Sequence, residues 1–143
     1  MQNFVKNISD DVRYVLMDVR FSPNNYYNHA GKIDLSCEDT VSVKEIKKDN
    51  FIITLSREIK SSEDFFNIFV MFDIYGRFNE AINDIEDIKE KIFIDSIIKE
   101  KNYLLDNCAA RISLMISQIS AQIGMAIPIV TPASILSNTN EAQ

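Results

Sequence analysis

The sequence has few of the residues from which catalytic and metal sites are usually built. It contains one histidine, two cysteines and three glycines among 143 residues. A single histidine in a polar loop, as at His29, is usually a solvated surface residue, and with two remote cysteines a zinc site lacks ligands. The glycines form neither a G-x-G motif nor a P-loop, so nothing supports a phosphate cradle. We therefore expect no enzyme activity, no metal and no cofactor.

Positive charge and an export signal are also scarce. The chain has 15 Lys and Arg against 21 Asp and Glu, a net charge of −6, whereas nucleic-acid surfaces need stripes of basic residues. The N-terminal MQNFVKNISDD lacks the apolar core of a signal peptide. Cys37 and Cys108 lie in different predicted elements, so free, buried thiols are expected. Together these features predict a cytoplasmic protein without a nucleic-acid partner.

One long stretch, residues 112–136, has no ionisable side chain. Its serines, glutamines and two prolines argue against a bilayer-spanning helix, so we expect no membrane insertion. A chain of this length forms one domain. One side of the stretch can pack on the rest of that domain, and a second subunit is the simplest cover for the other side.

Four segments have the alternation and β-branched content of strands: residues 11–22, 32–47, 51–59 and 65–78. A break near Asp39 predicts a bulge in the second. Short connections favour an antiparallel meander. The fourth segment, FFNIFVMFDIYGRF, is apolar on both faces, which is typical of a strand that is covered twice or that offers one face to a partner.

From residue 83 the apolar period becomes helical. It predicts one helix over about 84–99, capped by Asn83 or Asp84, and a second over about 103–123 that ends at Gly124. An extended, proline-containing segment (124–136) and a loose tail (137–143) follow. The predicted fold class is α+β: a single domain, residues 1–143, with a four-stranded antiparallel β-meander followed by two helices packed on one face.

The order of these elements and several short motifs resemble SecB, the tetrameric export chaperone, and its SecB-like relatives, over about residues 8–136. The first strand reads D-V-R-F-S-P, the fourth ends in an apolar segment with a glycine and a phenylalanine, and the main helix begins with Leu-Leu and carries Ala-Arg before a Gly and I-P-I-V-T-P. The residues are Asp18, Phe21, Pro23, Gly76, Phe78, Leu104, Leu105, Ala110, Arg111 and Gly124.

The sequence also departs from the family pattern. Cys108-Ala109-Ala110 replaces the usual Pro-Tyr before the helix arginine, and only residues 133–143 remain where the family has a further helix. In the export chaperone, acidic groups on the exposed sheet face dock the SecA translocase motor. Asp18 matches one such position, but its neighbouring acidic position is Ser22 here, with Arg20 close by. A role beside a toxin–antitoxin pair is therefore as consistent with the residues as export.

The resemblance implies an ATP-independent holdase that binds unfolded or pre-secretory polypeptides in an apolar groove. The alternative is a SecB-like interaction protein dedicated to one toxin–antitoxin or phage-associated partner, without general chaperone activity. The expected assembly is a homotetramer, with a dimer second. The residues assigned to the groove, whose alternative reading is intramolecular core, are Phe66, Phe72, Tyr75, Phe78, Ile119, Ile123, Met125 and Ile127; those assigned to the subunit interface are Arg111, Ser113, Ser117, Ser120 and Ala121.

Overall fold

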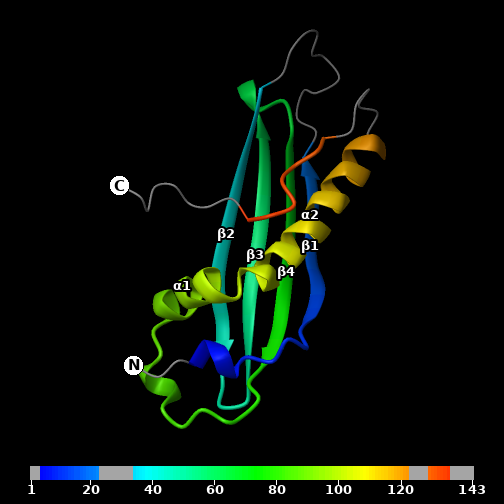
Figure 1. The fold of residues 1–143 in the computed structure, drawn as a ribbon. Coiled ribbons are helices and arrows are strands. Elements are labelled where there is room, and N and C mark those ends of the chain that lie inside the picture. The colour runs from blue at the N-terminus through cyan, green and yellow to red at the C-terminus, as the bar shows by residue number, and fades with distance from the viewer. Residues whose placement is uncertain (1–3, 23–33, 123–128, 136–143) are drawn as a thin grey trace.

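A computed structural model describes residues 4–22, 34–122 and 129–135 (Figure 1). The predictions for His29, Ile123, Gly124, Met125 and Ile127 lie outside these residues. In chain order the elements are η1 (Phe4–Asn7), β1 (Arg13–Ser22), β2 (Leu35–Ile46), β3 (Asn50–Ser61), η3 (Ser62–Asp64), β4 (Asn67–Arg77), η4 (Ile85–Asp87), α1 (Glu90–Glu100) and α2 (Asn102–Gln122).

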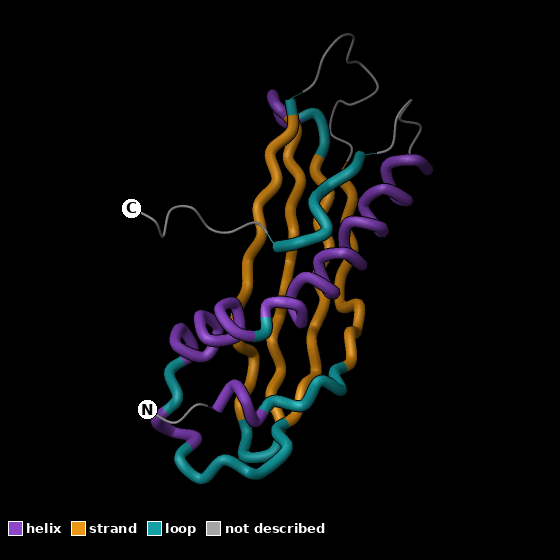
Figure 2. The backbone as a smooth tube through the Cα atoms, in the orientation of Figure 1, coloured by secondary structure: helices purple, strands orange, loops and turns teal. Residues whose placement is uncertain are grey.

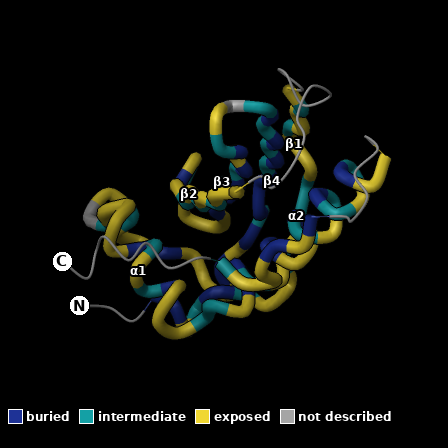
Figure 3. The backbone as a smooth tube through the Cα atoms, turned by 90° about the horizontal axis from the view of Figure 1, so that it is seen from above, coloured by how far each residue is buried: buried dark blue, intermediate teal, exposed yellow. Residues whose placement is uncertain are grey.

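The strands form one antiparallel sheet in the order β1-β4-β3-β2. Both helices lie on the same side of this sheet (Figure 3), so the predicted α+β class is confirmed. The predicted meander holds for β2, β3 and β4 but is wrong for β1, which pairs with β4. Tight turns join β2 to β3 and β3 to β4, whereas the longer connection over residues 23–34 lets β1 occupy the far edge.

Strand β4 lies between β1 and β3, which explains why its sequence is apolar on both faces. Alternate residues from Ile68 to Ile74 are buried beneath the helices. Phe69, Met71 and Tyr75 alternate with them on the opposite side, which we call the open face, and are half-buried. Among the described residues, no helix covers the open face.

The sheet has one bulge at a different place from the predicted one and a second bulge that was not predicted. Asp39 pairs regularly with Arg57, so the bulge predicted near Asp39 is wrong. The β2 register shifts between Val43 and Glu45 instead. A second shift, in β1 between Leu16 and Asp18, was not predicted.

The interruption predicted between the helices is confirmed, but α1 begins later than predicted. Phe78 and Ile82 donate main-chain hydrogen bonds to Asp49 and Lys48 in the β2–β3 turn. These bonds hold the chain against the end of the sheet, and the first turn after Asp84 is only the short η4. Helix α1 therefore starts at Glu90, with Lys89 as its N-cap.

Four phenylalanine rings close the end of the core where η1 and α1 meet the sheet. The Phe93 ring lies 5.2 Å from Phe51, 5.4 Å from Phe4 and 6.4 Å from Phe78, between ring centroids. Gly76 allows this packing, because a Cβ built there would lie 2.1 Å from Phe51 Cζ. The Phe51 ring therefore occupies the space that any side chain at residue 76 would need.

Replacing Gly76 by alanine should destabilise the protein by about 1–3 kcal/mol, the usual cost of overpacking a tight core. Urea unfolding of Gly76→Ala against the parent measures this difference. Ser42→Ala, an exposed substitution in β2, is the control and should stay within about 0.5 kcal/mol. Equal stability of Gly76→Ala and the parent would show that the Phe51 ring is free to move aside.

Candidate functional site

Residues 129–135, which we call the strap, lie across the helix-bearing face of the sheet beside α2 (Figures 1 and 2). The side chains of Ile129 and Thr131 are buried, whereas Val130 between them is 82% exposed. The strap thus covers β3 with alternate residues, as an extended chain does, although it adds no strand to the sheet.

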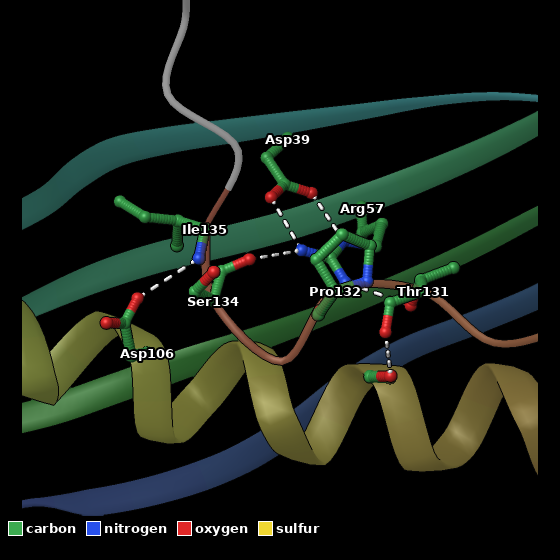
Figure 4. Close-up of polar contacts among 8 residues, drawn as sticks. Asp39, Arg57, Asp106, Thr131, Pro132, Ser134 and Ile135 are labelled. Carbon is green, nitrogen blue, oxygen red and sulfur yellow. Dashed lines mark hydrogen bonds and ion pairs between the residues drawn. The ribbon is translucent and has the colours of Figure 1, made fainter.

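Arg57 holds the strap from the sheet side (Figure 4). Its Nε and Nη2 donate to the two carboxylate oxygens of Asp39, at 2.6 and 2.8 Å. Its Nη1 donates to Thr131 Oγ1 at 2.9 Å and to the Pro132 carbonyl at 2.6 Å. Nη2 also donates to the Ser134 carbonyl at 2.9 Å. A guanidinium has five N–H donors, so each of them has an acceptor here.

Burial makes these acceptors necessary. The Arg57 side chain is 1% exposed and that of Asp39 is 3% exposed. Burial by itself would lower the pKa of Arg57, but the hydrogen bonds and charge of Asp39 outweigh it and raise the pKa above its ordinary value. The guanidinium therefore stays charged, and an unpaired charge at this depth would be costly.

Helix α2 holds the strap from the other side through three polar residues spaced seven apart, Asp106, Ser113 and Ser120. Ile129 N donates to Ser120 Oγ at 2.7 Å. Ser113 Oγ donates to the Thr131 carbonyl at 2.7 Å. Ile135 N donates to an Asp106 carboxylate oxygen at 3.1 Å. We call the space between these three residues and Arg57 the trough.

Three of the residues predicted to line a client groove belong to the core of this single chain. Phe66, Phe72 and Phe78 are each at most 7% exposed. Ile119 is half-buried and packs against the same core. Tyr75 lies on the open face, where it lines a hollow of about 550 Å3 whose other lining includes charged residues of β1, β2 and β4. Four of the five described members of this set thus share one core, and Tyr75 lies apart from them on the open face.

Asp18 also lies on the open face, opposite Met71 of β4. Its carboxylate forms an ion pair with Arg20 at 3.0 Å. The Arg20 guanidinium in turn lies over the Phe69 ring, 4.5 Å from its centroid. The acidic residue matched to translocase docking thus has a basic partner within its own strand.

The residues predicted for a subunit interface have different surroundings. Ser113 and Ser120 bond to the strap, as above, and Ser117 is half-buried. Arg111 and Ala121 are exposed. The Arg111 guanidinium lies over the Tyr14 ring, 4.6 Å from its centroid.

Several exposed apolar side chains lie at other positions of β1 and α2. Leu16, Met17 and Val19 on the edge strand β1 are 37–44% exposed, and Leu114 on α2 is 60% exposed. The alternation of β1 did not distinguish these positions from core, because the strand lies at the edge of the sheet, where its side chains have fewer neighbours.

Both cysteines are free thiols, as predicted, with Cys108 buried and Cys37 half-buried. Burial raises the pKa of Cys108 to about 12, so the thiol is uncharged at neutral pH and acts as a small apolar core residue. No helix in the described part of the chain is long and apolar enough to cross a membrane.

Comparison with known proteins gives a likeness of fold but none of sequence. No family model matches the chain, and no curated protein matches its sequence. Among solved structures, the Mycobacterium tuberculosis SecB-like chaperone Rv1957, in complex with a ChAD peptide from the Rv1956 HigA1 antitoxin, aligns over 91% of this chain and 88% of its own, with 14% identity and a TM-score of 0.58. The chain therefore has the SecB-like fold.

A second solved structure, a protein of unknown function from Streptococcus agalactiae, aligns over 85% of this chain and 96% of its own. It shares 11% identity, and its TM-score is 0.36.

Replacing Arg57 by methionine should destabilise the protein by about 3–5 kcal/mol, because the Asp39 carboxylate would remain buried without its countercharge. The double variant Arg57→Met/Asp39→Leu should recover part of that loss, since neither charge is then left in the interior. Urea unfolding of both variants measures the difference. A double variant no more stable than Arg57→Met would show that Asp39 is held mainly by groups other than Arg57.

Proposed function

We propose that this protein is an ATP-independent chaperone that binds extended or unfolded polypeptide segments. The observation that carries the proposal is the SecB-like fold, aligned over 91% of the chain with a chaperone solved in complex with a peptide. The strap supports it, because the same fold already holds a seven-residue segment of its own, outside any helix or strand, between α2 and β3. Binding of this kind uses equilibrium affinity and needs no nucleotide.

A dedicated partner, such as an antitoxin segment, is favoured over docking to an export translocase. The supporting observation is the Asp18–Arg20 ion pair, in which Arg20 also covers Phe69. A basic docking tail would have to displace Arg20 before reaching the carboxylate. This pairing reduces the negative potential of the open face at the position where the resemblance implied a docking site.

Self-association is part of the proposal. A second copy can cover the exposed apolar residues of β1 and α2, of which Leu114 is the most exposed. Strand β1 is an edge strand whose outer side has no neighbour in the sheet of the described residues. We propose a dimer through β1 and α2, from which a tetramer is built.

Aggregation assays test the chaperone function. We expect the protein, without ATP, to suppress light scattering of at least one chemically denatured protein at near-stoichiometric ratio. Suppression for several unrelated proteins would indicate a general holdase, and suppression limited to one partner segment would indicate a dedicated chaperone. Failure with every denatured protein and with antitoxin-derived segments would contradict polypeptide binding.

The association surface can be tested with two variants on the same face of α2. Leu114→Glu should shift the mass in solution toward the monomer, because it places a charge in the proposed apolar contact. Gln118→Glu adds the same charge one turn away at an exposed polar position and should leave the mass less changed. Light scattering coupled to size-exclusion chromatography measures both. An unaltered oligomer in Leu114→Glu would place the contact elsewhere.

A further inference from the structure

The hydrogen bonds that hold the strap use almost only its main chain. Six hydrogen bonds join it to α2 and β3 in the described part of the molecule, and five of them use main-chain atoms. Only the bond from Arg57 to Thr131 Oγ1 involves a side chain of the strap. The groups that hold the strap would therefore hold another extended segment almost as well.

The polar groups of α2 follow the strap in the opposite direction along the helix. Ile129 meets Ser120 and Ile135 meets Asp106, two positions separated by a helix rise of about 21 Å. The strap has no bend from Ile129 to Pro132 and bends at Ala133 and Ser134, where the Pro132 and Ser134 carbonyls both accept from Arg57. A partner that repeats these contacts is extended near Ser120 and Ser113 and bends beside Arg57.

We propose that the trough is the binding site for an extended partner polypeptide and that the strap is its intramolecular occupant. This inference rests on the proposed function and names its site and its regulation. The partner presents carbonyl oxygens to Arg57 and Ser113, and main-chain N–H groups to Ser120 and Asp106. Two of its side chains, spaced two residues apart, are small or β-branched, because they replace Ile129 and Thr131.

Prolines are compatible with such a partner, since Pro132 of the strap uses only its carbonyl. The bound partner has no acidic residue near Asp106 or near Asp39, which already carry negative charge beside the trough. Its chemistry is thus that of a neutral or basic extended segment, rich in small apolar residues.

Competition between strap and partner sets the affinity. A partner binds only those molecules whose strap has left the trough. Its apparent dissociation constant is the intrinsic one divided by the fraction of molecules in that state. Displacement exchanges hydrogen bonds of one main chain for those of another. The strap is also held by the buried side chains of Ile129 and Thr131 and by Ile135, which packs against the core, whereas Val130, Pro132, Ala133 and Ser134 are exposed.

Neighbouring strap residues provide a matched pair of variants. Ile129→Ser removes a buried side chain from the strap but leaves the trough intact, whereas Val130→Ser makes the same change at a residue that is 82% exposed. The probe is fluorescently labelled, reduced and carboxymethylated lactalbumin, which is permanently unfolded. Anisotropy titration of the full-length protein should show about tenfold tighter binding for Ile129→Ser and no change for Val130→Ser.

Two further measurements identify the trough. In the Ile129→Ser protein, Ser113→Ala should weaken binding about fivefold by removing one donor, whereas Ser117→Ala, which lacks a strap bond among the described residues, should not. A synthetic peptide of residues 127–137 should compete with the probe. In the parent protein, hydrogen exchange at the Ile129 and Ile135 amides should accelerate when this peptide binds.

The outcomes separate this inference from the proposed function. If the parent binds unfolded lactalbumin but Ile129→Ser and Val130→Ser bind it equally, the strap does not compete and the inference is overturned, while chaperone function stands. If Ile129→Ser binds more tightly than Val130→Ser but Ser113→Ala has no effect on binding, the trough is not the binding site and the inference is overturned. If neither the parent nor any variant binds the probe or the peptide, both fail.

Discussion

A charged guanidinium enclosed on the core face of β3 constrains the rest of this structure. Arg57 needs an acceptor for every N–H group because water does not reach it. Asp39 on the neighbouring strand supplies two, and the other three come from a segment more than seventy residues further along the chain. The position of residues 129–135 is therefore set by the requirements of one side chain, and α2 is fixed in turn through its own bonds to that segment.

Much of the fold followed from local patterns. Period-2 segments gave four strands within a few residues, and the change to helical period gave α2 almost to the residue. Two features depended on distant contacts and could not be predicted from such patterns. The place of β1 beside β4 depends on where a long connection leads, and the late start of α1 depends on bonds from residues 78 and 82 to the β2–β3 turn.

The candidate site was predictable only in part. Aromatic residues in β4 and directly beside it were assigned to a groove from a resemblance, yet Phe66, Phe72 and Phe78 are buried in the core. The stronger signal was Arg57, the one charged residue among the alternate apolar positions from Phe51 to Ile59. A basic residue on a core face requires buried acceptors, and its cross-strand neighbour is an aspartate. The strap supplies the other acceptors for Arg57, and nothing in the sequence of β3 indicates it.

The bulge in β1 has a consequence for assembly. Between Leu16 and Asp18 the strand carries an additional residue relative to β4, and such a bulge bends a strand and increases its twist. A neighbouring chain laid along the free edge could keep an unbroken ladder of backbone bonds only on one side of Met17. Association of two molecules at this edge would then depend more on contacts between side chains than on a continuous sheet. Such an edge is less able to extend into fibrils.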